Sequence, residues 1–397
     1  MSNALQNRIG RFMTESTFAR TLQQHWLAGS VLLLAVLARV FLLKVIPNTD
    51  VPEGYGPWYD EIVQYGRVKA WGRDISDYAP PYLYLLSLAS LLPFHKFVNI
   101  KLVPLVFDLW AAWLCVRLVK RIHPVGPIPM LAGLLFLLGP TVMANSALWG
   151  QVDVIYMTFL LLSLIYVLDE RPTRSVLAFS LALAFKLQAA FFLPALVVLF
   201  LERGWRLWRF ALAPVGYLLL SVPAILAGRA IGNTLTVYLR QVGSQGSLEQ
   251  NAASIYQWLP SPDPQLQARA GIVFAAAVCG FFIAAIHYLA KNKFDRKTQF
   301  SIAMLMAALP PFLLPNMHER YAYCSDVLAT LTPFVVPSLT LPAGLLIFAS
   351  LASYGPFLRH DWLPLPYAAA INAVALYLLA KNIARTTGMI SGRTPQS

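Results

Sequence analysis

Charged residues and cysteines are scarce in this sequence of 397 residues. Only 12% of the residues are charged and 58% are hydrophobic, whereas a soluble globular protein carries about 25% charged residues. This composition excludes an ordinary soluble domain. The three cysteines, Cys115, Cys279 and Cys324, are far apart, and no Cys-x-x-Cys or Cys/His metal spacing occurs. Neither a disulfide framework nor a zinc site is therefore expected.

The sequence also lacks the ten-residue segments of alternating apolar and polar residues that are typical of a transmembrane β-barrel. It has instead apolar stretches near 20 residues along its whole length, which predict an all-α polytopic membrane protein with one membrane-embedded domain over residues 1–397. The polar N-terminal segment has no A-x-A-like cleavage site, so we expect the first apolar run to be a retained span. We expect about twelve spans, at residues 26–45, 101–118, 126–144, 152–168, 175–187, 189–202, 207–227, 270–290, 298–314, 322–338, 341–356 and 364–380.

Basic residues indicate the orientation in the membrane. Residues 81–94 are apolar but too few for a comfortable span, so we expect a re-entrant or interfacial helix there. All the basic clusters then join the N-terminus on one side, which the positive-inside rule makes cytoplasmic. The net charge of +13 reports this topology, and no nucleic-acid partner is expected. The clusters are Arg8/Arg11/Arg20, Arg117/Lys120/Arg121, Arg171/Arg174, Arg203/Arg206/Arg209, Lys291/Lys293/Arg296/Lys297 and Lys381/Arg385/Arg393.

Unusual polar motifs fall on the other, extracytoplasmic face. The first outer loop, 46–100, is rich in Trp, Tyr, Pro and Asp, and a second long loop spans 228–268. Between them lie Trp-Gly-Gln-Val-Asp at 149–153 and Lys-Leu-Gln at 186–188, and His-Glu-Arg-Tyr follows at 318–321. Polar groups at membrane depth persist where they line a cavity. We therefore expect these dispersed motifs to converge on one site.

Each motif also has a structural interpretation. Trp149–Asp153 is equally consistent with a helix cap beside an interfacial tryptophan, and His318–Tyr321 with a salt bridge that pins a loop. Arg39 and Asp108, within apolar spans, are expected to be structural partners of neighbouring helices.

A cavity on the outer face has no nucleotide sugar available, so an enzyme there takes its activated donor from the membrane. A polyprenyl-phosphate sugar is such a donor, and its phosphate leaving group needs cations or a metal. Arg320, His318 and Lys186 supply cations, and no paired-carboxylate metal motif occurs, so neither a metal nor a cofactor is expected. A carboxylate of the first loop would take the proton from an acceptor hydroxyl. The loop offers Asp50, Asp60, Glu61 and Asp77, of which Asp50 directly follows the first span.

These motifs resemble those of the GT-C superfamily of polytopic glycosyltransferases, and most closely those of bacterial relatives of the GPI-anchor mannosyltransferases. The resemblance covers about residues 26–330. The residues that carry it are Asp50 with Pro57-Trp58, Asp77-Tyr78-Ala79-Pro80-Pro81, Trp149–Asp153, Lys186-Leu187-Gln188 and Met317–Tyr321.

The resemblance implies an inverting transfer of a hexose, with mannose or glucose favoured, to a lipid-linked or surface glycan, glycolipid or protein. It implies that Asp50 is the catalytic base. An aromatic residue often follows the loop acid in such families, but Val51 follows Asp50 here, which leaves Asp60 as a rival. A bacterial inner membrane fits the short loops. Substrate and donor contacts are expected from Lys186, Gln188, His318, Glu319, Arg320, Tyr321, Asp77, Tyr78, Gln151, Asp153 and Trp58, with Glu319 orienting its neighbours.

Two other functions stay open at this point. A flippase or transporter of lipid-linked sugar often shows inverted repeats, and we find no convincing repeat. A membrane polymerase or ligase that uses a diphosphate-linked oligosaccharide predicts a large outer loop between late spans, for which 228–268 is the comparable segment.

Overall fold

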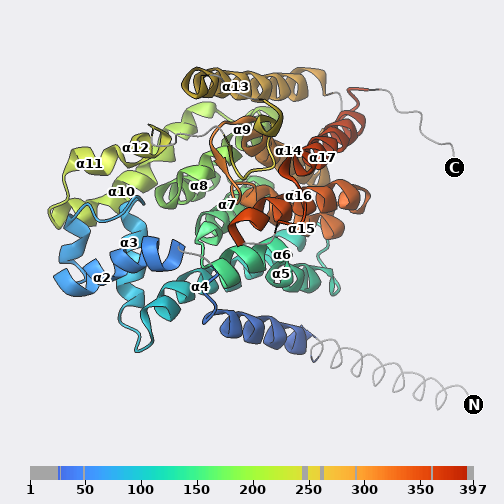
Figure 1. Cartoon of the computed structure of the whole chain (residues 1–397). Helices are drawn as coiled ribbons and strands as arrows, with labels where there is room; N and C mark the ends of the chain where they lie inside the picture. The colour runs from blue at the N-terminus through green and yellow to red at the C-terminus, as the bar shows by residue number, and fades with distance from the viewer. Residues whose placement is uncertain are drawn as a thin grey trace, which may run out of the picture.

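The chain folds into a bundle of helices, as a computed structural model shows (Figure 1). The structure describes residues 26, 28–47, 50–243, 249–259, 263–290, 293–358 and 361–390. Outside the described residues lie the predicted basic residues of the N-terminal segment, Arg8, Arg11 and Arg20. Lys291, Arg393 and parts of the loop 228–268 also lie outside them. In the described part of the chain, β pairing is limited to a ladder between two-residue strands and an isolated bridge between Asn251 and His318. The predicted all-α membrane class is confirmed.

The first half of the chain forms the helix Ala28–Leu42 and a series of helices around the first loop and the first long span. These are η1 Asp50–Tyr55, α2 Gly56–Tyr65, η2 Lys69–Gly72, α3 Pro80–Ala89, α4 Lys96–Val119, α5 Ile128–Leu138, α6 Pro140–Val142, η3 Met143–Trp149 and α7 Asp153–Leu168.

The second half continues with helices that are mostly separated by short turns. They are α8 Pro172–Phe185, η4 Leu187–Phe192, α9 Leu193–Glu202, η5 Leu207–Leu212, α10 Ala213–Leu226, α11 Ile231–Leu235, α12 Val237–Gly243, β1 Glu249–Gln250, η6 Ile255–Trp258, α13 Pro264–Leu289, α14 Arg296–Leu313, β2 Met317–His318, α15 Tyr323–Val335, η7 Pro337–Leu339, α16 Thr340–Leu358 and α17 Leu365–Thr386.

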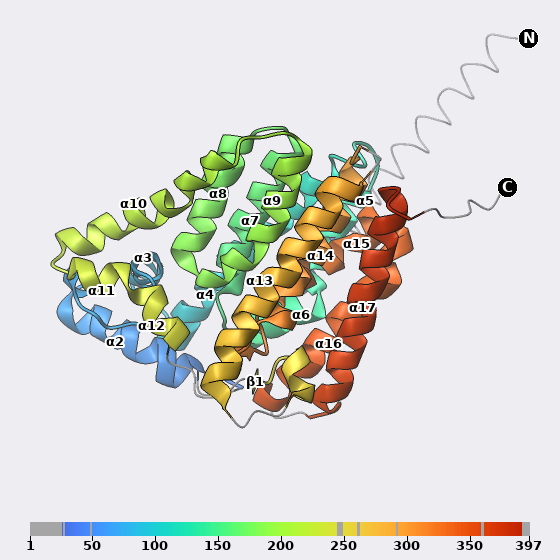
Figure 2. The same cartoon turned by 90° about the horizontal axis from the view of Figure 1, so that it is seen from above.

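Local chemistry places several helix starts. Asp263 and Asp295 accept backbone N–H groups at the first turns of α13 and α14, the usual role of an acidic N-cap. Proline begins α3, α8 and α13, where its missing N–H costs no helical hydrogen bond. The central helices α7 and α14 are buried along almost their whole length, and α13 lies on the outside against α9 and α14 (Figure 2).

Every predicted span contains a helix, but the predicted count of twelve spans is not confirmed. Among the described residues, five helices are long and apolar enough to cross a membrane. A sixth is added if α5 and the bent continuation through Trp149, at 43°, form one broken span. Helices α7, α8 and α9 have 16, 14 and 10 residues, so at 1.5 Å per residue each is shorter than the roughly 30 Å hydrocarbon core. The protein is nevertheless a multi-pass membrane protein.

The predicted re-entrant segment forms α3, a helix of ten residues. Its length is half of what a span requires. It packs against α2, α4 and α10, and Tyr84 donates to the Leu220 carbonyl of α10 over 2.8 Å.

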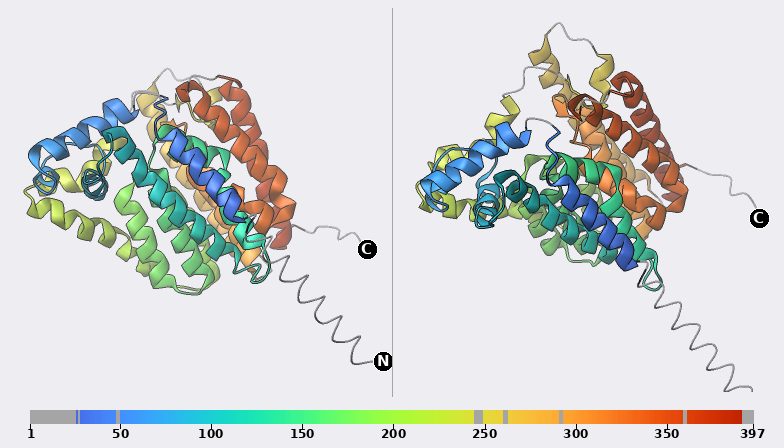
Figure 3. Two further views of the ribbon diagram at one scale, coloured as in Figure 1. Left: turned by 90° about the horizontal axis from the view of Figure 1, so that it is seen from below. Right: turned by 60° about the horizontal axis from the view of Figure 1, so that its bottom comes forward.

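Three of the predicted basic clusters meet at one end of the bundle. Arg121, after α4, pairs with Asp169, after α7, and Arg296 at the start of α14 donates to the Arg121 carbonyl over 2.5 Å. Arg203, after α9, pairs with Glu170 at 2.7 Å. The described ends of the chain also lie on this side (Figure 3, left). The opposite end of the same helices therefore carries the polar motifs.

Within the bundle, Arg39 and Asp108 form an ion pair at 3.0 Å, with side chains 1% and 0% exposed. Ser146 donates to the same Asp108 oxygen over 2.6 Å. The pair joins the first helix to α4 and η3, which is the structural role expected of charges at this depth.

Candidate functional site

Asp50 links the first loop to the turn that precedes α7. It is the first residue of η1, and its Oδ2 accepts from Trp149 Nε1 over 3.1 Å and from Gln151 Nε2 over 2.5 Å. Tyr55, one turn further along η1, donates to Gln151 Oε1 over 2.7 Å. The amide of Gln151 is thus held at both ends, which fixes the donor that it presents to Asp50.

The turn itself depends on Gly150, whose φ is +86°. A side chain is disfavoured in this left-handed region, and a Cβ there would approach Val51 Cγ2 to 3.0 Å. Glycine thereby lets the chain reverse between η3 and α7, so that Trp149 and Gln151 both face Asp50. The structure supports a tight turn at this motif, with Asp153 as the first residue of α7.

Asp153 anchors the two cations of the site. Its Oδ1 forms an ion pair with Lys186 Nζ, and its Oδ2 lies 3.8 Å from Arg320 Nε. Asn145 Nδ2 donates to Oδ2 over 2.8 Å. The Asp153 and Lys186 side chains are 1% and 7% exposed. Because a buried charge requires a partner, Asp153 holds Lys186 and Arg320 in place.

The His-Glu-Arg-Tyr segment is fixed by backbone pairing and by its own charges. Strand β2 pairs with β1, so Gln250 of the second long loop lies beside His318 in the ladder. Glu319 bonds Arg320 Nη1 at 2.5 Å and lies 3.7 Å from His318 Nδ1. Burial raises the pKa of Glu319, but Arg320 and His318 outweigh it and hold the pKa below its ordinary value. Glu319 therefore contacts both Arg320 and His318, and its role in orienting them stays a prediction.

Trp149 contacts both Asp50 and Arg320. Its ring is fully buried and stacks on Phe357 with centroids 4.4 Å apart. The Arg320 guanidinium carbon lies 5.3 Å from the ring centroid, while the indole N–H donates to Asp50. Asp50 and Arg320, 270 positions apart in the printed sequence, thus contact the same side chain.

Aromatic rings surround this centre. Tyr55, Trp58, Tyr78 and Tyr82 form one cluster with centroids 5.2–6.3 Å apart, and Lys186 Nζ lies 5.3 Å from the Tyr78 centroid. The predicted contacts Trp58 and Tyr78 therefore adjoin the cationic part of the site.

Tyr321 contacts the rings of His318 and Phe191, with centroids 5.1 and 6.0 Å away. Its hydroxyl interacts with Gln188. The Lys-Leu-Gln and His-Glu-Arg-Tyr motifs therefore touch each other.

Two predicted residues lie apart from this centre. Asp60, on α2, pairs with Lys96 at 2.7 Å, and its side chain is 56% exposed. Asp77 is exposed in the segment before α3 and interacts with Arg240. Neither carboxylate is a partner of Trp149 or Gln151, whereas Asp50 is.

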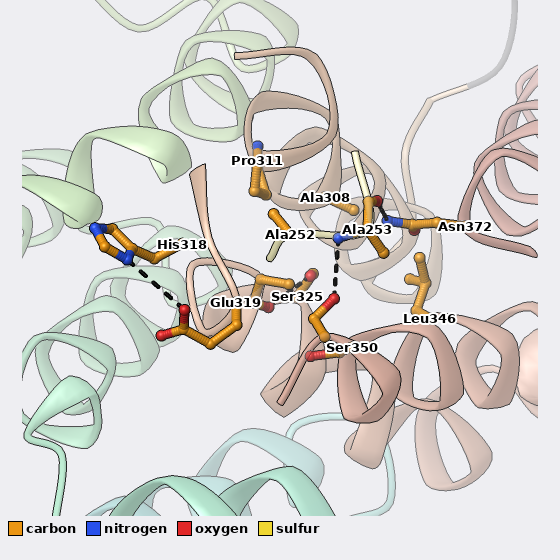
Figure 4. A pocket seen from close by; sticks show the side chains of 12 residues that line it. Ala252, Ala253, Ala308, Pro311, His318, Glu319, Ser325, Leu346, Ser350 and Asn372 are labelled. Atoms are coloured by element: carbon orange, nitrogen blue, oxygen red, sulfur yellow. Dashed lines mark hydrogen bonds and ion pairs between the residues drawn. The ribbon is translucent and has the colours of Figure 1, made fainter. Parts of the chain in front are cut away.

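A small cavity lies beside the site (Figure 4). Glu319 and His318 line one side of it, and its other lining residues include Ser325, Ser350 and Asn372. Its volume is about 20 Å³, which holds a water molecule but not a sugar. Asp50, Lys186 and Arg320 do not line this cavity, so it adjoins Glu319 and is separate from the centre that these three residues form. The described residues contain no cluster of three or more His, Cys, Asp or Glu side chains that could hold a metal ion.

Sequence reasoning missed three contributors. Asn145 and Tyr55 hold site residues from neighbouring turns, and Trp149 was interpreted only as part of its motif or as an interfacial ring. The signal for Trp149 was its place directly before a glycine and two polar site residues. Nothing in the local pattern distinguished Asn145 or Tyr55 from ordinary polar residues near a membrane surface.

A sequence profile of glycosyltransferase family 87 matches residues 77–315, which is more than half of the chain. The chain belongs to glycosyltransferase family 87. The match includes Gln151, Asp153, Lys186 and Gln188, and it begins after Asp50. Among curated proteins no match is found. Membership confirms the glycosyltransferase class expected from the GT-C resemblance, and it does not specify the sugar, the donor or the acceptor.

Proposed function

We propose that this family 87 protein transfers a hexose from a polyprenyl-phosphate donor, with inversion, to a glycan, glycolipid or protein acceptor outside the cytoplasm. The observation that carries the proposal is the shared contact of Asp50 and Arg320 with Trp149. A single displacement requires a base on one side of the reacting carbon and a stabilised leaving group on the other. The contacts of the Asp50 carboxylate and the Arg320 guanidinium with one buried ring support this arrangement.

In this proposal Asp50 takes the proton of the acceptor hydroxyl while the hydroxyl oxygen attacks the anomeric carbon. The bond from that carbon to the phosphate oxygen breaks, and the lipid phosphate leaves with the electron pair. Lys186 and Arg320 stabilise the charge that grows on the phosphate, and the planar fork of arginine suits its oxygens. Both cations are already held by Asp153 and Glu319, so little reorganisation is required when the charge develops.

The proposed orientation is supported by the charges at the two ends of the bundle. The end that joins Arg121, Arg203 and Arg296 is proposed to be cytoplasmic by the positive-inside rule, which places Asp50 and Arg320 at the outer surface. A lipid-linked donor is the activated sugar available there. We propose the inner membrane of a bacterium as the location and mannose or glucose as the sugar, in line with the mannosyltransferase resemblance.

The test is sugar transfer by purified protein from a radiolabelled polyprenyl-phosphate hexose to a glycolipid extract of the source membranes. Asp50→Asn is expected to lower kcat by about 10²–10⁴-fold, the usual contribution of a general base. Asp60→Asn is the matched control, because Asp60 is an exposed carboxylate of the same loop, and it is expected to retain near-normal transfer.

Three results would overturn parts of the proposal. Loss of transfer in Asp60→Asn but not in Asp50→Asn would reassign the base. Movement of the lipid-linked sugar across vesicles without chemical turnover would favour a flippase. Activity only with a diphosphate-linked oligosaccharide would favour a ligase.

A further inference from the structure

A buried lysine lies beneath the contact between Asp50 and the Trp149 turn. Lys101, in the second turn of α4, is 1% exposed. Its Nζ donates to the carbonyl oxygens of Leu42 over 2.6 Å, Val45 over 2.8 Å and Leu148 over 2.9 Å. All three ammonium hydrogens thus reach backbone carbonyls, and these carbonyls belong to two different segments.

The two segments are those that carry the site. Leu42 is the last residue of the first helix and Val45 follows it, shortly before Asp50, whereas Leu148 directly precedes Trp149. The aliphatic stem of Lys101 also packs under the turn, since a Cβ on Gly150 would lie 3.0 Å from Lys101 Cγ. One side chain therefore ties the approach to Asp50 to the approach to Trp149.

We infer that Lys101 is a positioning residue for Asp50. Its three hydrogen bonds set the position of the first loop relative to the Trp149 turn. The effect of Lys101 on catalysis rests on the proposed function, whereas its effect on the position of Asp50 does not. The hydrogen bonds from Trp149 and Gln151 to Asp50 cross between the two segments that Lys101 joins. When the clamp is released, the segments are free to shift, and Asp50 loses its alignment without losing its chemistry.

A general salt-bridge role does not account for this residue. The three acceptors of Lys101 are carbonyl oxygens, so the ammonium neutralises no carboxylate through them. Placing a charge in such a site is costly unless its hydrogen bonds are made. A methionine of similar length would fill the space without the cost of burying a charge, but it would donate no hydrogen bond to the three carbonyls. Lys101→Met therefore removes the connection between the two segments while it keeps the packing.

The first test measures geometry without activity. Cysteines are introduced by Asp50→Cys and Gln151→Cys, and a short thiol crosslinker is applied with and without Lys101→Met. Gln151 is itself 1% exposed, so the three buried native cysteines are replaced by alanine in every protein compared, and the introduced pair is then the pair of thiols that the reagent can join. Crosslinking is expected to fall several-fold with Lys101→Met. The matched control is Lys44→Met, an exposed lysine near the same helix end, which is expected to leave crosslinking unchanged.

The second test is kinetic. Lys101→Met is expected to lower kcat by about 100-fold, the cost of a misplacement near 1 Å, with little change in the donor KM, because Lys186 and Arg320 hold the donor phosphate. In an Asp50→Asn background the same substitution is expected to cost almost nothing further. A loss from misfolding would instead multiply with that of Asp50→Asn and would reduce the folded yield.

Unchanged crosslinking in Lys101→Met, or kinetic losses that multiply, would overturn the inference. If crosslinking falls while the unmodified protein transfers no sugar, the positioning role stands and the proposed function fails. If the unmodified protein transfers sugar and Lys101→Met changes neither crosslinking nor kcat, the proposed function stands and the positioning role fails.

Discussion

Replacing Asp153 by asparagine tests how the charges of the site are held. In the native protein Asp153 pairs with Lys186 and lies 3.8 Å from Arg320 Nε. Asparagine keeps the size and an acceptor for Asn145 but removes the negative charge. Lys186, whose side chain is 7% exposed, is then a buried cation without its anion, while Arg320 still has Glu319.

The magnitude follows from this burial. Breaking a buried ion pair by removing one partner costs about 3–5 kcal/mol, because the remaining charge stays desolvated. Asp153→Asn is therefore expected to lower the free energy of unfolding by that amount. Removing both charges, in Asp153→Asn with Lys186→Gln, leaves no uncompensated ion, so most of the lost stability is expected to return. Sugar transfer is not expected to return, since the phosphate has lost a cation.

The assay is denaturant-induced unfolding in detergent micelles, followed by tryptophan fluorescence, for the unmodified protein, both single variants and the double variant. The double-mutant cycle isolates the pair from the separate effects of each side chain. If the double variant is destabilised by the sum of the two single losses, the pair is not coupled, and the view that Asp153 anchors Lys186 is wrong.

Two further predictions concern the turn and the outer loop. Gly150→Ala is expected to lower the free energy of unfolding by more than about 1–2 kcal/mol, the cost of an alanine in the left-handed region, because the added Cβ also meets Lys101 at 3.0 Å. Gly126, with φ +90° and no atom within 4 Å of an added Cβ, is the control, and Gly126→Ala is expected to carry only the backbone cost. Equal losses of stability in the two variants would refute this prediction. Hydrogen bonds from Arg240 hold the pKa of Asp74 below its ordinary value. The unfolded chain then binds this proton at higher pH than the native protein, so stability is lost as the pH falls below about 4. Asp74→Asn is expected to flatten the acid side of a stability–pH profile, and an unchanged slope would contradict the assignment.

The helices could be predicted well from the sequence and the number of spans could not. Long apolar runs located α4, α13 and α17. The runs at α7 and α8 are equally apolar, but they end at Asp169 and Lys186, which shortens each helix. Whether such short helices cross a membrane depends on their neighbours and on tilt, and neither is written in the local sequence.

The candidate site was predictable in its residue types and less so in its connections. Lys186 and Arg320 stood out because cations flanked by apolar runs are rare. The choice between Asp50 and Asp60 could not be made from spacing, since both follow the first span within one loop. The structure separates them by their partners, Trp149 for Asp50 and Lys96 for Asp60. Lys101 was invisible to sequence reasoning because its partners are backbone carbonyls that only the tertiary fold brings together.

The anomeric configuration of the product is the most direct test of the claim that Asp50 and a charged phosphate leaving group act in one displacement. Purified protein would be given a polyprenyl-phosphate hexose of known anomer and methanol as a simple acceptor, and the methyl glycoside would be examined by NMR. The account predicts the opposite anomer, formed by the unmodified protein and by Asp60→Asn but not by Asp50→Asn. A product with the donor's own configuration would require either two successive displacements or attack on the face that the phosphate leaves, and would contradict it.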